Sequence, residues 1–244
     1  MSDEADPTTE AEPEPKPEAK PDATAESKPP RPNATRTKWL IFIVVALLSL
    51  IADQGTKIWA RETLPMHGSG TGEHAACIVP DDIVTGHCAG TAVPVIESFW
   101  HWRLSMNPGS AFGLFSGQTF ARVLLSLVGI GAVFGMIWML KKARDDQRIL
   151  HWALALVAGG AVGNLIDRIY YGVVTDMVLW HVGDHDPKID RWAHEWPVFN
   201  VADIVLVVGV GLMFIDIQKE GKRDKEKRKR RDEKARKAGL VKDL

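Results

Sequence analysis

Four long apolar stretches divide the sequence, and polar residues flank each of them. The stretches are Trp39–Ala52, Val123–Leu140, Ile149–Ile166 and Ile204–Ile217. A membrane-spanning helix needs about 20 residues, so the first and fourth reach that length only if the neighbouring polar motifs continue the same helices. The alternation of apolar and polar positions that marks a barrel strand is missing from all four. Because a lone span satisfies its own backbone as a helix, the pattern predicts four transmembrane helices.

The composition changes sharply outside these stretches. Residues 1–37 are rich in Pro, Glu, Ala and Thr and have almost no large apolar side chains, so they cannot offset the entropy of ordering. We therefore expect a disordered acidic tail at 1–37, a four-helix membrane domain at 38–218 and a basic tail at 219–244. In the basic tail acids alternate with bases and aromatic residues are missing. We interpret it as a solvated segment that contacts anionic lipid head groups, not as a nucleic-acid-binding surface.

Lysine and arginine near the span ends set the expected orientation. They precede the first span, fill the loop between the second and third, and follow the fourth, at Arg36, Lys38, Lys141, Lys142, Arg144, Arg148, Lys219, Lys222 and Arg223. We expect these three flanks, and both termini, on the cytoplasmic side. The two remaining connections, at about 61–120 and 170–198, then face outward.

Five short polar motifs lie at the ends of the spans or inside them. They read DQGTK at 53–57, NPGSAF at 107–112, GNLIDR at 163–168, Thr175-Asp176, and FNVAD at 199–203. Charge at membrane depth costs roughly 2.5–3.5 kcal/mol per residue, so a set of such motifs needs a common purpose. The expected orientation brings all of them to the outer leaflet, which predicts a water-accessible reaction centre there.

Spacing of three or four residues places side chains on one helical face. Asp53 and Lys57 can pair within one helix, and Asn200 and Asp203 are three residues apart. Asn164, Asp167 and Arg168 share a face in the same way. For the charged pairs, structural support between helices and direct contact with the site are both open.

Asp176 and Asp203 differ from the other acids because no basic residue lies within four positions of either. If the two meet at low dielectric, both cannot ionise and one keeps its proton. Such a pair can take a proton from water and give one to a leaving amine, which is the chemistry of an aspartic peptidase. A proton or cation path uses the same residue types, and spacing alone does not decide between the two.

Glycines recur at intervals that allow helices to approach closely. The second span carries Gly131 and Gly135, and we expect Gly159, Gly160 and Gly163 to open one face of the third. We interpret these residues as helix-packing positions. They do not form a phosphate-binding loop, which needs a preceding strand and a following Gly-Lys-Ser/Thr.

At this point the motifs resemble one family, the lipoprotein signal peptidases or signal peptidase II, which are integral-membrane aspartic peptidases. The resemblance covers roughly Trp39 to Ile217, with the motifs in family order. DQGTK resembles the first-helix motif, NPGSAF the Asn-x-Gly-x-Ala-Phe segment, GGAVGNLIDR the third-helix motif and FNVAD the fourth-helix motif. The set is highly specific, although any one motif alone is weak.

The resemblance implies a mainly α, four-helix membrane fold with a small extracytoplasmic β-element between the first two helices. It implies Asp176 and Asp203 as the catalytic pair. Positions that bind substrate or support the site are Asp53, Lys57, Asn107, Gly109, Asn164, Asp167, Arg168 and Asn200. The implied reaction removes the signal peptide of a diacylglyceryl-modified prolipoprotein, before the lipid-bearing cysteine, at the outer leaflet of the cytoplasmic membrane. No cofactor or metal is implied, and nucleic acid is not an expected partner.

The alternative function is a small proton-coupled transporter that uses the same carboxylates, and a non-catalytic scaffold is a third option. One chain carries the whole expected site, so we expect a monomer surrounded by membrane lipids. Met177 stands where the family usually has an aromatic residue, and the outer loops are longer than usual for the family. We also predict a disulfide between Cys77 and Cys88, because both lie in an outer loop.

Overall fold

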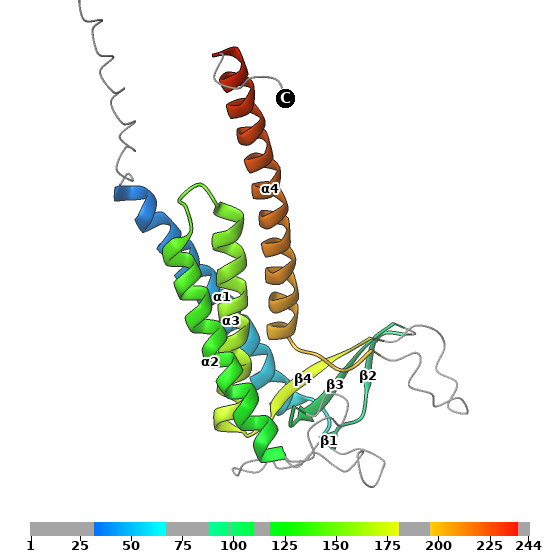
Figure 1. Ribbon diagram of the computed structural model, residues 1–244. Helices are drawn as coiled ribbons and strands as arrows, with labels where there is room; N and C mark the ends of the chain where they lie inside the picture. Colours follow the sequence, from blue (N-terminus) through cyan, green and yellow to red (C-terminus); the bar gives the residue numbers. More distant parts are fainter. Residues whose placement is uncertain (1–31, 67–87, 98, 110–117, 181–195, 239–244) are drawn as a thin grey trace, which may run out of the picture. The chain divides into compact units, whose positions relative to one another are not determined.

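The structure is a computed structural model, and it describes residues 32–66, 88–97, 99–109, 118–180 and 196–238. Cys77, and with it the predicted disulfide to Cys88, lies outside the described residues. In chain order the elements are α1 (Pro32–Thr63), β1 (Cys88–Ala89), β2 (Val93–Ile96), β3 (Trp100–Asn107), α2 (Gln118–Lys142), α3 (Arg148–Tyr170), β4 (Val174–Trp180) and α4 (Val201–Lys237). The four-helix prediction is confirmed (Figure 1).

All four helices are long and apolar enough to cross a membrane. The third is central, since 61% of its most apolar window is buried, against 22%, 6% and 17% for α1, α2 and α4. The first and fourth helices continue through the polar motifs, as their length required. DQGTK therefore lies within α1, and the fourth span begins directly after Asn200.

Small residues on α3 let α1 and α4 approach it closely. A Cβ atom at Gly159 would lie 2.8 Å from the carbonyl oxygen of Ala46 on α1. One at Gly160 would lie 2.7 Å from the carbonyl oxygen of Ala202 on α4. The expectation that these glycines open a single face is thus wrong, because adjacent helical positions point about 100° apart.

The packing role expected of the glycines in the second span is also not found. Within the described residues, no heavy atom comes within 4 Å of a Cβ built at Gly131 or Gly135. Gly129, two residues before Gly131, is the glycine that faces α3, near Ala161 and Leu165. The four-residue interval alone does not show which side of a helix meets a neighbour.

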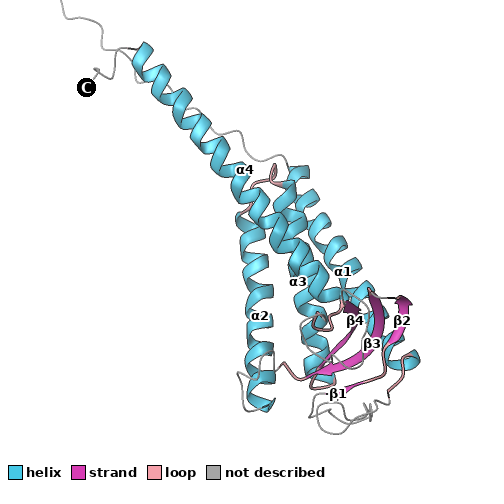
Figure 2. Cartoon of the chain, turned by 90° about the vertical axis from the view of Figure 1, so that its right-hand side faces the viewer, coloured by secondary structure: helices cyan, strands magenta, loops and turns pink. Residues whose placement is uncertain are grey.

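Four antiparallel strands form a small sheet beside one end of the helices (Figure 2). The central strand β3 pairs with β4 on one side and with β1 and β2 on the other. A register shift between Trp102 and Ser105 leaves Ser105 opposite Asp176. The expected β-element is therefore present. Its fourth strand comes from the segment after α3.

The segment before α4 adds one more pairing to this sheet. Phe199 forms an isolated bridge with Val178, with backbone hydrogen bonds of 3.0 and 2.8 Å between them. Met177, next to Val178 on β4, is fully buried in the same hydrophobic cluster as Leu104 and Met106. The bridge brings the first turn of α4 next to β4, which is the local event that assembles the site.

The opposite end of the helices gathers the three basic flanks. Lys38 of α1 lies 3.6 Å from Asp145 in the α2–α3 loop. The same loop is ion-paired to α4 through Arg144–Glu220 and Asp146–Arg223. The polar motifs and the basic flanks therefore lie at opposite ends of the bundle, as the sequence predicted.

Asp216 of α4 lies near this end of the helices. It is buried and accepts a hydrogen bond of 3.1 Å from Gln147.

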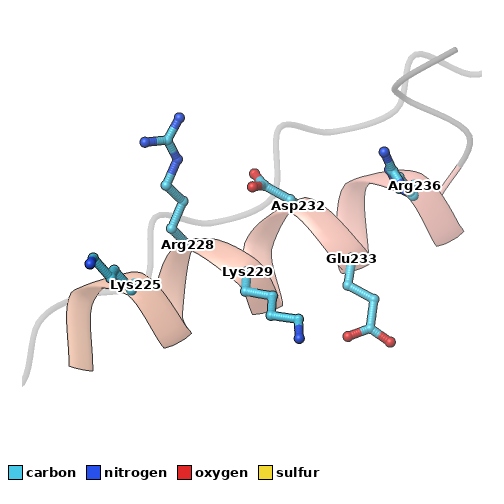
Figure 3. Close-up of a pocket in the computed structure, with 6 residues that line it drawn as sticks. All are labelled: Lys225, Arg228, Lys229, Asp232, Glu233 and Arg236. Atoms are coloured by element: carbon cyan, nitrogen blue, oxygen red, sulfur yellow. The ribbon is translucent and has the colours of Figure 1, made fainter. Parts of the chain in front are cut away.

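Beyond Ile217, α4 continues as an exposed helix to Lys237, past the ends of the other helices (Figure 2). A shallow pocket on this extension is lined by the charged residues Lys225, Arg228, Lys229, Asp232, Glu233 and Arg236 (Figure 3). It lies far along the chain from the polar motifs and has no part in the site below.

Candidate active site

Asp176 and Asp203 meet through a third residue, Asn200. The Asn200 side-chain amide donates to Oδ1 of Asp176 at 2.7 Å. Asn200 also caps α4: its Oδ1 accepts from the Asp203 N–H at 3.0 Å, and its own N–H donates to Oδ2 of Asp203 at 3.1 Å. This reciprocal arrangement is a capping box. A single residue therefore fixes both carboxyl groups.

The two carboxyl groups lie in different surroundings. Asp176 is 3% exposed on β4, whereas Asp203 is half-buried in the first turn of α4. Burial, followed by the nearby charge of Asp203, raises the pKa of Asp176 to about 8. Asp203 sits where the helix N-terminus favours negative charge. Two acids whose surroundings differ in this way can take separate acid and base roles.

Asn164 on α3 connects this pair to a buried cation. Its Nδ2 donates to Oδ1 of Asp203 at 2.9 Å. Its Oδ1 accepts from Asn200 at 3.1 Å and from the Lys57 ammonium at 2.9 Å. Because an ammonium group can donate and cannot accept, Lys57 dictates which end of the Asn164 amide faces Asp203.

Asn107 reaches Asp176 from the end of β3. Its Nδ2 donates to Oδ2 of Asp176 at 3.2 Å, while its Oδ1 accepts from the backbone N–H of Gly109 at 2.9 Å. Gly109 has φ of +91°, a conformation that glycine adopts without the steric cost paid by other residues. The turn after β3 thereby fixes the orientation of the Asn107 side chain.

Behind these residues lies a buried chain of charges between α1 and α3. Lys57 is completely buried, 2.9 Å from Asp53 and 3.4 Å from Asp167. Oδ1 of Asp53 accepts from the N–H of Ala202 at 2.9 Å, which fastens α1 to the start of α4. Gln54 bridges Asp53 and the carbonyl oxygen of Gly163, at 3.0 and 3.1 Å. These residues join three helices beneath the site.

Arg168 bonds within its own helix. Its Nη1 donates to the carbonyl oxygen of Asn164 at 3.2 Å, one turn back on α3. Its charge lies close enough to interact with those of Asp176, Asp203 and Asp167. Basic groups distant in sequence therefore face the two aspartates, although none lies within four positions of either.

The structure brings together every residue that the sequence singled out for the site. Asn107, Asn164 and Asn200 contact the two aspartates directly, and Asp53, Lys57 and Asp167 form the layer below. Sequence reasoning missed Gln54, Arg61 and the role of Thr175. Arg61 lies four positions after Lys57 and eight after Asp53, so helical periodicity could have found it.

Within the described part of the chain, no group of three or more His, Cys, Asp or Glu side chains could hold a metal ion. The site holds two carboxyl groups in different surroundings, contacted by three carboxamides. Groups of this kind activate water by general acid–base catalysis.

These features define a multi-pass membrane protein with a paired-carboxylate site at one end of its helices. Residues 45–219 match the family model described as "Signal peptidase (SPase) II". The chain belongs to this peptidase family. Membership gives no support to the transporter alternative.

Individual relatives agree with this assignment. The chain is 35% identical to the "Lipoprotein signal peptidase" of Halalkalibacterium halodurans, over 77% of this chain and 99% of that protein. It is 32% identical to that of Xanthomonas campestris pv. campestris, over 80% of this chain and 96% of that protein. A solved structure described as "Bacterial membrane enzyme structure by the in meso method at 2.3 A resolution" superposes with a TM-score of 0.54 at 25% identity, covering 75% of this chain and 90% of the other.

Proposed function

We propose that this protein is an aspartic endopeptidase that removes the signal peptide from diacylglyceryl-modified prolipoproteins, cutting before the lipid-bearing cysteine. One observation carries the aspartic mechanism: Asn200 joins a buried Asp176 to a half-buried Asp203. Membership in the signal peptidase II family supports the substrate class. The layer of Asp53, Lys57 and Asp167 supports the pair from below.

The first step is the attack of water on the scissile carbonyl carbon. Asp203, as the carboxylate, takes one proton from the water while the water oxygen bonds to the carbon. Asp176 gives its proton to the carbonyl oxygen, so a neutral tetrahedral intermediate forms. Asn107, Asn164 and Asn200 keep the carboxyl oxygens in place, which limits reorganisation during the proton transfers.

The second step breaks the carbon–nitrogen bond. Asp203 returns its proton to the departing nitrogen of the lipid-bearing cysteine, and Asp176 recovers a proton from a hydroxyl of the intermediate. The products are the carboxylic acid of the signal peptide and the free amine of the lipoprotein. The pair ends in its starting protonation state, so each turnover consumes one water molecule and no cofactor.

We propose that the site faces outward at the outer leaflet of the cytoplasmic membrane. The basic flanks at the other end of the bundle support this orientation through the excess of Lys and Arg in cytoplasmic loops. Both termini are then cytoplasmic, with residues 1–37 and 219–244 as tails around a peptidase domain at 38–218. Because the described chain contains both aspartates and their partners, we propose a monomer whose partners are membrane lipids and the precursor.

The test is cleavage of a lipid-modified precursor by the purified protein in detergent. The wild type is expected to release the shortened lipoprotein, whereas Asp176→Asn and Asp203→Asn are expected to release none while keeping the wild-type unfolding temperature. An unlipidated precursor serves as the matched control for substrate class. Substantial turnover by either folded variant contradicts the aspartic mechanism.

A further inference from the structure

Arg61 of α1 touches three parts of the segment that leads into Asp176. Its Nη1 donates to Oγ1 of Thr175 at 2.7 Å. The same nitrogen lies 3.7 Å from Oδ1 of Asp167. Its guanidinium carbon lies 4.2 Å from the centre of the Tyr171 ring, in a cation–π contact. With 7% of its surface exposed, Arg61 is almost wholly enclosed.

These contacts span the tight turn between α3 and β4. Tyr171 caps the end of α3, where its N–H donates to the backbone carbonyl oxygen of Asp167 at 2.8 Å. Gly172 then turns the chain with φ of +79°. Thr175 follows on β4 with no exposed surface, and its N–H donates to Oδ2 of Asp167 at 2.8 Å. Arg61 and Asp167 therefore hold both the hydroxyl and the backbone of the residue just before Asp176.

Arg61 acts from the side of β4 that faces away from the reaction centre. Successive side chains of a strand point to opposite faces, so Thr175 points toward α1 while Asp176 points toward Asn107 and Asn200. The hydroxyl of Thr175 acts both as acceptor and as donor: it accepts a hydrogen bond from Arg61 and donates one to the sulfur of Met106 at 3.8 Å. A shift of Thr175 would move the Asp176 carboxyl group with it, because the two residues share a peptide bond.

We propose, building on the peptidase function above, that Arg61 is a positioning residue for the reaction, acting on Asp176 through Thr175 and the α3–β4 turn. It does not contact substrate. The role requires an arginine, because a planar guanidinium can stack on Tyr171 while it bonds Thr175 and Asp167. A lysine at the same position keeps the charge and loses the stacking and the fixed donor geometry.

The experiment compares Arg61→Lys and Thr175→Val, assayed as purified protein with the lipid-modified precursor. Misplacement of a catalytic group by about 1 Å can cost on the order of 100-fold in rate, so we expect kcat to fall about 10- to 100-fold in each variant. KM is expected to stay at the wild-type value. The alkaline limb of the pH profile is expected to move to lower pH, since a displaced Asp176 interacts less with Asp203.

Two further comparisons separate positioning from general loss of structure. The double variant Arg61→Lys/Thr175→Val should lose no more kcat than the worse single variant, as coupled residues are non-additive, and Thr175→Ser should recover kcat relative to Thr175→Val. Arg103→Lys is the matched control, because Arg103 bonds the carbonyl oxygen of Gly90 on the other side of the sheet, and it is expected to keep wild-type kcat. The near-isosteric Thr175→Val keeps the proposal testable if Arg61→Lys does not fold.

The outcomes distinguish the two proposals. If the wild type does not cleave the precursor, the proposed function is wrong, whatever the variants do. If the wild type cleaves and both single variants keep its kcat and pH profile, the positioning role is overturned and the peptidase function stands. A change in KM alone also overturns it, because that result would place Arg61 in substrate binding.

Discussion

The side-chain nitrogen of Asn200 lies 2.7 Å from Oδ1 of Asp176, while the side-chain oxygen of the same residue caps the helix that carries Asp203. The amide of Asn200 has two N–H groups, and the second donates to Asn164 at 3.1 Å. Asn200 thus serves both as the N-cap of α4 and as the link between the two carboxyl groups. A substitution that keeps the cap and removes the link tests the second role alone.

Asn200→Ser is expected to keep the helix cap and lose the bridge. A serine hydroxyl can accept from the N–H of Asp203, so the unfolding free energy should change little. It cannot donate simultaneously to Asp176 and Asn164, so we expect kcat to fall by at least about 10-fold, the scale of one lost catalytic hydrogen bond. Thermal unfolding and cleavage kinetics on the same preparation measure the two effects.

Asn200→Ala is the matched comparison because it removes the cap as well. It should lose about 1 kcal/mol of stability relative to Asn200→Ser while showing a similar kcat. If both variants keep wild-type kcat, the bridge between the carboxyl groups has no catalytic importance.

The pH dependence of cleavage follows from the raised pKa of Asp176. Burial, together with the charge of Asp203, raises that pKa to about 8. Asp176 therefore holds its proton below pH about 8 and loses it above, and the loss removes the proton donor for the carbonyl oxygen. We expect kcat/KM to decline as the pH rises through about 8, in a profile measured with the lipid-modified precursor.

The control for this prediction is protein stability across the same range. Because folding raises the pKa of Asp176, the unfolding temperature should fall gradually as the pH rises to about 8 and level off above it. If the decline in rate is catalytic, the unfolding temperature should stay above the assay temperature throughout. A rate that keeps rising to about pH 10 would show that Asp176 is not the group whose proton the reaction needs.

The helices, and the contacts between residues of one helix, could be predicted from the sequence. Four apolar stretches with polar ends required membrane helices, and the i,i+4 spacing of Asp53 and Lys57 matched an observed ion pair of 2.9 Å. The spacing of Asn200 and Asp203 matched a capping box. Such predictions succeed because helix geometry alone fixes the distance between positions three or four apart.

Contacts between segments far apart in the chain were beyond that reasoning. Arg61 meets Thr175 across 114 positions, and no local rule pairs a helix residue with a strand residue at that separation. The faces of α3 were also misassigned, because periodicity does not say which neighbour lies opposite each glycine. Both gaps concern how elements pack, which depends on the bridge between Phe199 and Val178 and on the sheet.

Lys57→Met is expected to destabilise the protein strongly. The ammonium is completely buried between Asp53 and Asp167, and its removal leaves two carboxylates with less compensation. Breaking a buried ion pair in this way costs about 3–5 kcal/mol. The unfolding temperature in detergent should fall markedly, and activity should fall too because the Asn164 amide loses the donor that orients it.

Lys227→Met is the matched control for that experiment. Lys227 also pairs with an acid, Asp224 at 3.8 Å, but both side chains are exposed, and exposed pairs contribute about 0–1 kcal/mol. Its unfolding temperature should equal that of the wild type. Equal unfolding temperatures for Lys57→Met and Lys227→Met would contradict the role assigned to the buried charges.

Gly163→Ala is expected to damage the site by displacing Asp53. A Cβ at position 163 would overlap the Asp53 carboxylate, whose other oxygen holds the N–H of Ala202. Overpacking of this kind costs about 1–3 kcal/mol, and the displaced carboxylate would shift Lys57 and the start of α4.

Gly131→Ala is the matched control, since the described residues leave open space at that position and alanine favours a helix by about 0.5–1 kcal/mol over glycine. Cleavage rate and unfolding temperature should both fall for Gly163→Ala, and both should hold or rise for Gly131→Ala. Equal behaviour of the two variants would show that α1 does not pack against α3 as closely as the structure requires.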